Sequence, residues 1–522
     1  MTLTNYLGGR WVDGRGPGTT LVDPVTGDAL AWASSDGLDL AAALAFARST
    51  GGPVLRARTF AERGAMLARI ADILASNRGA YFAIALANSG SPESDAAMDI
   101  DGAIFTLKYY ARLASGLEGG RVLREGGRIR VAKDEAFQAE HLAVPLRGVA
   151  ILINAFNFPA WGLWAKAAPA LLSGVPVFAK PATSTAWLAQ RMVEDVVKAG
   201  AVPDGALSVM CGRAGHLLDH VTASDVVAFT GSADTARDVR GHAAVLRHAT
   251  RVNVEADSVN AAILGPDVRP GSPEFDLLVR EVVREMTVKA GQKCTAIRRV
   301  LVPASVRQDV EEAIRTALGS IVVGNPRHAS VRMGPLVSKA QQHAALDGLA
   351  ALQHETTTIF DGGPAFSPVD ADESVAAFVP PTLLSVHDAS DAETVHDVEV
   401  FGPVATVVPY ADTADAFALA RRGRGSLVAS LFSADTAWLA DGALELAESH
   451  GRVLAVNDAV GKTHTGHGNV MPNCLHGGPG RAGGGEELGG LRALALYHRR
   501  SAIQAHTDVL SALGDRVSDW RV

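Results

Sequence analysis

The stretch KAGQKCTAIRR at 289–299 places one cysteine, Cys294, between a Gly-Gln-Lys run and two arginines. A thiolate is a strong nucleophile for a carbonyl carbon, provided that its surroundings lower the thiol pKa from about 8.5. The chain contains three cysteines, an odd and sparse set that does not indicate a disulfide framework. Cys294 is therefore either a small core residue or the group that performs the chemistry.

Three more polar residues follow strand-like apolar runs. Asn157 lies in NAFNFP, and an asparagine amide can donate into a developing oxyanion. Lys180 closes VPVFAK, where an ammonium could reach ribose or phosphate oxygens. Glu255 ends RVNVE, and a carboxylate at the mouth of a sheet can act as a general base. Taken singly, each could also be an ordinary turn asparagine or an exposed strand-end charge.

The tetrapeptide FTGS at 229–232 lies where a strand is expected to turn into a helix. Free backbone N–H groups at a helix start attract phosphate. An ordinary strand–helix turn with Ser232 as its N-cap is the equal alternative.

Two other nucleotide-binding patterns fail on context. The glycines within 478–483 satisfy G-x-G-x-x-G, but a loop precedes them and no βαβ unit follows, so we expect a flexible surface loop. The tripeptide at 461–463 resembles the end of a Walker A loop, but the required earlier glycine is Val456.

A metal site is not expected. His464, His467, His476 and Cys474 are close in sequence, but their spacing is not a usual zinc pattern. We interpret these histidines as loop residues.

The elements that must position these groups alternate in type. Strand-like runs separated by helical patterns predict parallel βαβ units, which place ligands at the carboxyl ends of the strands. A second α/β region is expected from about residue 275, and strands with turns are expected within 127–154. The expected helices are 38–50, 60–76, 78–90 and 98–116, and the expected strands are 149–154, 175–180, 225–232 and 259–265.

Composition narrows the class of protein. The chain has 522 residues and a net charge of −8, which argues against a nucleic-acid-binding surface. We see no apolar run long enough for a membrane span and no signal peptide. A cytoplasmic protein with no membrane or nucleic-acid partner is the expectation.

The motifs and their order resemble the aldehyde dehydrogenase superfamily, over roughly residues 5–505. The matching segments are NAFNFP (154–159), KPA (180–182), FTGS (229–232), VEADS (254–258), GQKCTA (291–296) and EVFGPV (399–404). The resemblance implies an α/β fold with a Rossmann-type cofactor domain, an α/β catalytic domain and a small β oligomerisation arm. The implied divisions are 1–126 with 150–262 for the cofactor, 263–489 for catalysis, and 127–149 with 490–522 for the arm and tail. A homodimer or tetramer is implied as well.

The resemblance also implies roles for single residues. Cys294 would attack a small-molecule aldehyde as a thiolate, and the Asn157 side chain with the Cys294 backbone N–H would hold the oxyanion. Hydride transfer to a nicotinamide would leave a thioester, which Glu255 would hydrolyse by activating water. The presence of this base favours a free acid as product. Nearby Lys293 either activates the thiol or faces solvent.

The residues implied to bind the cofactor are Lys180, Thr183, Phe229, Gly231, Ser232, Glu399 and Phe401. Many relatives that prefer NAD carry an acidic residue three positions after this lysine, and that residue would repel a 2′-phosphate. Thr183 stands there in this chain. We therefore expect NADP, with NAD as the alternative.

Departures from the family pattern narrow the substrate. Glu255 is followed by ADSV instead of LGGK, Ala236 replaces a glycine, and the C-terminal loop reads HGGPGRAGGGEELGG. These segments resemble semialdehyde dehydrogenases that act on coenzyme A (CoA) thioesters in bacterial aerobic aromatic degradation, such as benzoate oxidation. The alternatives are a dehydrogenase of simple aldehydes, a cofactor-independent cysteine thioesterase and a redox sensor. The Arg298–Arg299 pair is either a site for CoA phosphates or, more in keeping with most such pairs, structural.

Overall fold

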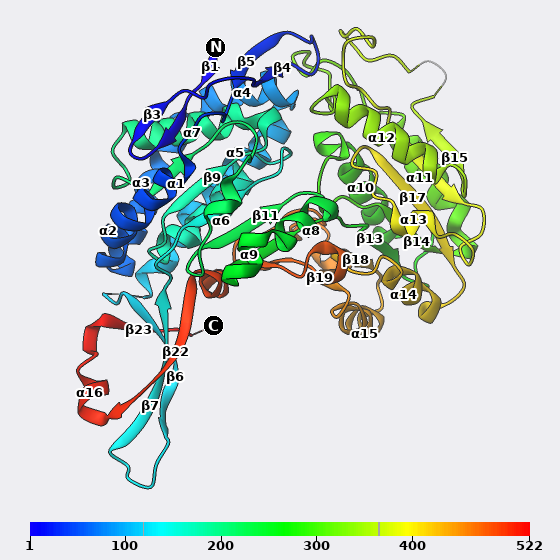
Figure 1. Cartoon of the computed structure of the whole chain (residues 1–522). Coiled ribbons are helices and arrows are strands. Elements are labelled where there is room, and N and C mark those ends of the chain that lie inside the picture. The colour runs from blue at the N-terminus through cyan, green and yellow to red at the C-terminus, as the bar shows by residue number, and fades with distance from the viewer. Residues whose placement is uncertain (118, 364–365, 522) are drawn as a thin grey trace.

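A computed structural model describes residues 1–117, 119–363 and 366–521 of the chain (Figure 1). Two seven-stranded sheets with helices on their faces form the bulk of the molecule, and a narrow β arm projects away from them. A small sheet near the N-terminus has the order β1-β5-β4 and comprises β1 (Thr2–Leu3), β4 (Thr19–Val22) and β5 (Ala29–Ala33).

The first large sheet has the order β12-β11-β8-β9-β10-β2-β3. Its five strands from β8 to β12 run parallel, and β2 and β3 add an antiparallel edge. The parallel strands are almost wholly buried and rich in Val, Ile and Ala, as expected for strands covered on both faces. The strands are β2 (Asn5–Leu7), β3 (Arg10–Val12), β8 (Ala150–Ile153), β9 (Val177–Lys180), β10 (Leu207–Val209), β11 (Val226–Thr230) and β12 (Arg251–Glu255).

The second large sheet has the order β15-β16-β17-β14-β13-β18-β19 and is parallel except for β15. The chain enters it directly from the first sheet, because β13 starts six residues after β12 ends. The strands are β13 (Ala261–Leu264), β14 (Arg299–Pro303), β15 (Thr356–Asp361), β16 (Thr382–Val386), β17 (Val404–Tyr410), β18 (Ser426–Phe432) and β19 (His450–Val456).

The arm is a sheet of order β22-β7-β6-β23. Its long strands pair over nine residues between β22 and β7, from His498 opposite Pro145 to His506 opposite Phe137. Figure 1 shows these strands extending beyond the two large sheets. The strands are β6 (Val122–Arg130), β7 (Phe137–Pro145), β22 (His498–His506) and β23 (Val517–Asp519).

The helices begin and end close to the sequence-based expectations. The helix expected at 60–76 is α3, which Thr59 and Glu62 start with a reciprocal capping box. The helix expected from 98 begins five residues earlier, after Pro92. The long helices are α3 (Phe60–Ser76), α4 (Arg78–Ser89), α5 (Glu93–Ser115), α6 (Trp161–Leu172), α7 (Ala186–Lys198), α10 (Pro273–Thr287), α11 (Arg307–Leu318), α12 (Lys339–Leu352) and α15 (Thr436–Leu446). The shorter ones are α1 (Leu40–Phe46), α2 (Gly52–Ala57), α8 (Ala233–Gly241), α9 (Ala243–His248), α13 (Thr394–Asp397), α14 (Thr413–Arg421) and α16 (Thr507–Ser511).

The expectation of a flexible surface loop around 478–483 is wrong. The segment lies within a two-stranded hairpin formed by β20 (Leu475–Gly477) and β21 (Glu486–Leu488). Its glycines allow close backbone contact, since a Cβ on Gly483 would lie 2.4 Å from the Val254 carbonyl oxygen. The hairpin therefore packs tightly against the rest of the chain.

Within the described residues, no helix combines the length and the apolar character needed to cross a bilayer.

Candidate active site

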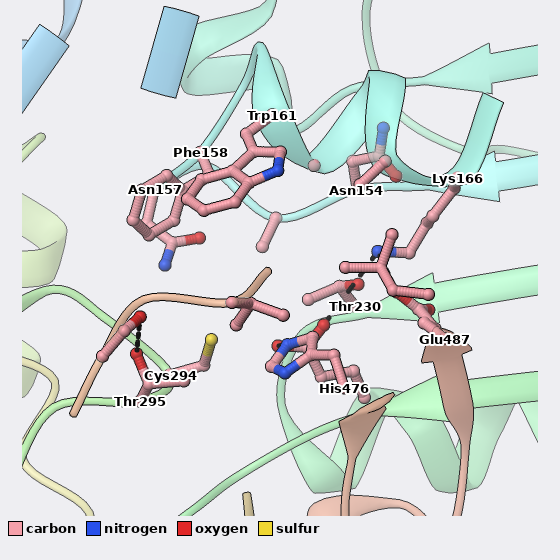
Figure 2. Close-up of a pocket in the computed structure, with 17 residues that line it drawn as sticks. Asn154, Asn157, Phe158, Trp161, Lys166, Thr230, Cys294, Thr295, His476 and Glu487 are labelled. Carbon is pink, nitrogen blue, oxygen red and sulfur yellow. Dashed lines mark hydrogen bonds and ion pairs between the residues drawn. The ribbon is translucent and has the colours of Figure 1, made fainter. Parts of the chain in front are cut away.

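Side chains from several distant segments surround one pocket of about 620 Å³ including its open mouth (Figure 2). Apolar groups such as Phe158, Trp161, Val470 and Leu488 form much of its wall. The pocket also gathers a thiol, two carboxylates, an ammonium and an imidazole, which belong to Cys294, Glu255, Glu487, Lys166 and His476.

Cys294 follows a strained turn that fixes its position. Lys289 and Ala290 adopt left-handed backbone angles, and so does Gly291, where an added Cβ would lie 2.2 Å from the Gly402 carbonyl oxygen. After the turn, the Asn260 amide donates to the Cys294 carbonyl oxygen at 2.8 Å. The thiol consequently points into the pocket, as Figure 2 shows.

The surroundings of Cys294 favour the neutral thiol. Burial raises its pKa well above the ordinary value, and the neighbouring Glu255 charge raises it further. Lys293 lowers this pKa only weakly against those effects. The Glu255 carboxylate is a group able to take the thiol proton, since one of its oxygens lies within 4.8 Å of the sulfur.

Glu255 ends β12 and is buried. The His476 Nε2 lies 3.0 Å from its Oε1, and the Lys166 Nζ lies 4.0 Å from its Oε2. Burial by itself would raise the pKa of the Glu255 carboxyl, but the neighbouring His476 and Lys166 side chains hold that pKa below its usual range. The group is thus an ionised carboxylate beside the thiol.

Asn157 lies in the loop after β8 and lines the same pocket. Its Nδ2 donates to the Gln292 carbonyl oxygen at 3.0 Å, which uses one of its two N–H groups and fixes the amide. The Cys294 backbone N–H has no protein acceptor within the described chain. Two donors are therefore present near the thiol, as an oxyanion site requires.

Lys293 does not face solvent, so that sequence-based alternative is wrong, and activation of the thiol stays a prediction, since Lys293 lowers the Cys294 pKa against larger opposing effects. Its ammonium is fully buried and contacts both carboxylate oxygens of Glu285 at 2.7 Å. A buried charge must be paired, and this pair lies beneath the turn that carries Cys294. The pair is structural.

Arg298 and Arg299 are also buried and structural, which is the more common of the two alternatives for such an arginine pair. Arg298 donates to the carbonyl oxygens of Gly402 and Gly291 at 2.7 and 2.9 Å. Arg299 donates to three more carbonyl oxygens and contacts a histidine nitrogen. Neither guanidinium is exposed to receive CoA phosphates.

Sequence reasoning missed Lys166, Glu487 and His476. The Lys166 Nζ lies 2.9 Å from Glu487 Oε2, and Asn253 donates to the other oxygen of Glu487 at 3.0 Å. Lys166 is the one charged residue in the otherwise apolar helix α6, and a lysine there requires a buried partner. The lone lysine in an apolar helix could therefore have been noticed in the sequence. No sequence pattern distinguishes His476 and Glu487 from ordinary loop residues.

His476 corrects the interpretation of the C-terminal histidines as simple loop residues. It pairs with Glu487 across the β20–β21 hairpin and directs its ring into the pocket (Figure 2). His467 is fully buried and contacts the Ser430 hydroxyl. Cys474 is exposed.

The residues expected to bind a cofactor surround the carboxyl edge of the first sheet. Lys180 ends β9 and is buried, which lowers its pKa to about 8. The Thr183 hydroxyl donates to the Gly212 carbonyl oxygen at 2.9 Å, and Arg213 follows as an exposed residue. Arg213 is therefore next in the chain to the residue that Thr183 contacts, and the position three residues after Lys180 bears no carboxylate.

The FTGS segment forms the expected strand–helix turn. Phe229 is buried, and Ser232 caps α8. Gly231 lies so close to the Phe229 ring that an added Cβ would be 2.6 Å from a ring carbon. Asp257 accepts a hydrogen bond from Ala233 N at 3.0 Å. The Ala233 N–H at the start of α8, which could have faced a phosphate, therefore already donates to Asp257.

Glu399 and Phe401 lie on the opposite side, before β17. Ser258 N donates to one Glu399 oxygen at 3.1 Å, and the other oxygen receives no hydrogen bond in the described chain but lies 3.7 Å from Arg298 Nη2. Burial raises the pKa of this carboxyl to about 7, although Arg298 opposes the shift. Phe401 packs edge-on against Phe156, with 5.7 Å between the ring centres.

Comparisons with known proteins agree with this geometry. A family model described as the aldehyde dehydrogenase family matches residues 11–497. A 3,4-dehydroadipyl-CoA semialdehyde dehydrogenase of Aromatoleum evansii is 62% identical over 479 residues, covering 92% of this chain and 93% of that protein. The crystal structure of Staphylococcus aureus betaine aldehyde dehydrogenase in complex with NAD+ has the same fold, with a TM-score of 0.85 at 23% identity over 97% of this chain and 95% of that one. The chain belongs to the aldehyde dehydrogenase family, whose members are oxidoreductases acting on aldehydes.

Proposed function

We propose that this enzyme oxidises a CoA-linked semialdehyde of the 3,4-dehydroadipyl type to the carboxylic acid, with NADP as the oxidant, in the aerobic degradation of aromatic compounds. The observation that carries the proposal is 62% identity over 92% of the chain to an enzyme with that name. The pocket supports it, because its apolar wall suits a carbon chain and its polar end presents a thiol and a base.

In this proposal Cys294 is the nucleophile. Glu255 takes the thiol proton, and the sulfur attacks the aldehyde carbon. The second Asn157 N–H and the Cys294 backbone N–H then stabilise the oxyanion. After oxidation, Glu255 gives up the thiol proton to solvent and then takes a proton from water, which attacks the thioester and releases the acid.

The residues at the carboxyl edge fit a nicotinamide dinucleotide. The Glu399 oxygen that receives no hydrogen bond in the described chain would accept one from a ribose hydroxyl, and Lys180 lies buried at the end of β9. Gly231 lets the turn pass close to the Phe229 ring, and the turn leads into α8, whose start could bind a pyrophosphate. When bound, this cofactor accepts the hydride from the aldehyde carbon.

A preference for NADP follows from charge at one corner of this edge. Thr183 adds no negative charge. Its hydroxyl donates to the carbonyl oxygen of Gly212, the residue before Arg213. Lys180 at the end of β9 and Arg213 in the loop after β10 would then face the 2′-phosphate.

The proposed functions of the domains follow the boundaries of the sheets. Residues 1–126 with 150–262 would bind the cofactor, and 263–489 would carry the nucleophile. Residues 127–149 with 490–522 would mediate homo-oligomer formation through the arm. Exposed apolar side chains on its strands, such as Phe137 and Ile503, support this role.

The substrate proposal is tested by comparing kcat/KM for a CoA-linked semialdehyde and for the same semialdehyde as a free acid. Formation of reduced cofactor gives the rate. We expect a preference of about tenfold or more for the CoA-linked form, equal to about 1.4 kcal/mol of transition-state binding. Equal values would indicate a dehydrogenase of simple aldehydes.

A further inference from the structure

One wall of the substrate pocket rests on helix α5. Trp161 forms part of this wall, and Figure 2 shows its indole ring across the pocket from Cys294. The Trp161 Nε1 donates to the Thr106 hydroxyl at 3.1 Å, and a Cβ on Gly102 would lie 2.8 Å from the indole ring. Because Trp161 and Gly162 are only half-buried, the wall extends to the protein surface beside α5.

A stripe of side chains continues from this wall toward the C-terminal end of α5. The stripe comprises Gly102, Phe105, Tyr109 and Arg112. Their spacing of three or four residues places them on one face of the helix. Phe105 exposes 42% of its surface, and both Arg112 and Lys108, one turn before it, are exposed. The stripe therefore runs from an apolar end beside the pocket to a cationic end about 15 Å further along the helix axis.

A third cation reaches this face from the C-terminal part of the chain. Leu488 lines the pocket, and the backbone then passes Tyr109, since a Cβ on Gly490 would lie 2.9 Å from the Tyr109 hydroxyl oxygen. Arg492 follows two residues later and is exposed. Burial raises the pKa of Tyr109, and the nearby charge of Arg112 opposes that rise. Two separate segments thus bring arginines to the neighbourhood of Tyr109.

We call Lys108, Arg112 and Arg492 the cationic patch. The stretches 102–115 and 488–497, which carry the patch, contain no aspartate or glutamate. Asp101, the acidic residue that precedes the first stretch, is already paired with Arg78 at 2.7 Å. A surface that is cationic at one end and apolar at the other complements a ligand with phosphate groups on a long arm.

We propose that this surface binds the CoA part of the substrate, with the pantetheine arm over Phe105 and Tyr109 and the phosphates on the cationic patch. The inference rests on the proposed oxidation of a CoA-linked semialdehyde. It names the surface that distinguishes such a substrate from a free semialdehyde, a role that the buried Arg298 and Arg299 cannot fill.

The order of groups along the substrate matches the direction of the surface. The aldehyde carbon must reach Cys294, and the acyl chain then runs along the apolar wall to Trp161. The thioester end consequently leaves the pocket beside α5, where the pantetheine arm meets Phe105. The phosphates, at the far end of that arm, reach the cationic patch.

The test uses three substrates that share one semialdehyde group. They are the CoA thioester, the pantetheine thioester, which lacks the nucleotide and its phosphates, and the free acid. The Lys108→Ala/Arg112→Ala/Arg492→Ala variant removes the cationic patch. Formation of reduced cofactor gives kcat and KM for each substrate with wild type and variant.

The matched control is the Arg10→Ala/Arg15→Ala/Arg332→Ala variant. It also removes three exposed positive charges, and none of these residues lines the pocket. A change caused only by the lower net charge would therefore appear in both triple variants.

We expect the patch variant to raise KM for the CoA thioester about tenfold or more, because charge-assisted contacts with the phosphates are lost. Its kcat/KM for the pantetheine thioester and for the free acid should stay within about twofold of wild type, which also shows that the variant is folded. Added salt should raise KM for the CoA thioester more in wild type than in the variant. The control variant should behave as wild type.

A second variant, Phe105→Ser, tests the path of the arm. It should raise KM for the CoA and pantetheine thioesters by a similar factor, about threefold or more, because both lose an apolar contact. Activity on the free acid should not change.

Three outcomes would overturn the inference. They are a wild-type KM for the CoA thioester in the patch variant, an equal rise for the CoA and pantetheine thioesters in that variant, and an unchanged KM for both thioesters in Phe105→Ser. A wild type that does not prefer the CoA thioester to the free acid would defeat the substrate proposal as well. A normal preference that the patch variant retains would defeat the surface alone.

Discussion

The reactive residues come from four separate parts of the chain, and their order along it was informative. The motifs predicted Cys294, Glu255 and Asn157, which the structure brings to one pocket. His476 and Glu487 could not be predicted, because their roles depend on a hairpin register that no local pattern specifies. Thr183 and Lys180 were predicted as a pair, whereas Arg213 emerges only from the contact between Thr183 and Gly212.

At the scale of single residues, Arg213 is expected to recognise the 2′-phosphate. Arg213→Ala should raise KM for NADP about tenfold or more and leave KM for NAD unchanged, since NAD lacks that phosphate. Steady-state kinetics with both cofactors measure the effect. The control is Arg332→Ala, an exposed arginine on the second α/β region. An equal change for both cofactors would contradict the assignment.

Glu399 predicts a pH dependence of cofactor binding. Its pKa of about 7 is raised above the ordinary carboxyl value by burial, so the carboxylate that accepts from ribose forms as pH rises through this value. The dissociation constant of the cofactor should therefore fall about tenfold between about pH 6 and about pH 8. Calorimetric titration measures it. A Glu399→Gln enzyme with the same slope as wild type would refute this origin.

At the scale of elements, the alternation of helices and strands was predictable and the turns between them were not. Periodicity located α3, α4 and the buried strands β8, β9, β11 and β13 within a few residues. The left-handed turn at 289–291 carries no local signal apart from Gly291, since Lys289 and Ala290 rarely adopt such angles. Tertiary contact with Gly402 decides that conformation, and it aims Cys294.

Alanine substitutions at two glycines distinguish the positioning of Cys294 by this turn from the cost of backbone strain alone. Both Gly291 and Gly271 have positive φ, but a Cβ at Gly291 would lie 2.2 Å from a carbonyl oxygen, whereas none would be met at Gly271. Gly271→Ala should cost about 1 kcal/mol of stability with normal kcat. Gly291→Ala should lose more stability and most of its activity, as thermal unfolding and initial rates would show. Equal activity in both variants would mean that the turn does not position the thiol.

At the scale of the whole molecule, the arm predicts an oligomer. Ile129, Val131, Phe137, Val144 and Ile503 expose 36–45% of their surface on or beside its strands. Composition and motif order predicted the arm only through the family resemblance, because an exposed sheet of this kind has no distinctive periodicity.

Charged substitutions in the arm should therefore disrupt assembly. The Phe137→Lys/Ile503→Lys double variant should elute as a monomer, measured by size-exclusion chromatography with light scattering. The control is Leu444→Lys, which alters an 80% exposed leucine on α15 away from the arm. Unchanged mass in the arm variant would contradict the proposed interface.

The central claim is that Cys294 forms a thioester with a CoA-linked acyl group, and the mass of the Cys294 peptide tests it most directly. Glu255→Gln enzyme would be mixed with NADP and the CoA-linked semialdehyde, then digested without reducing agent. The account predicts about one reduced cofactor per active site, formed more slowly than in wild type because the thiol must lose its proton to solvent, and a Cys294 peptide that carries the whole acyl-CoA, because deacylation lacks its base. An unmodified Cys294 peptide, or an adduct on Cys211 or Cys474, would contradict it.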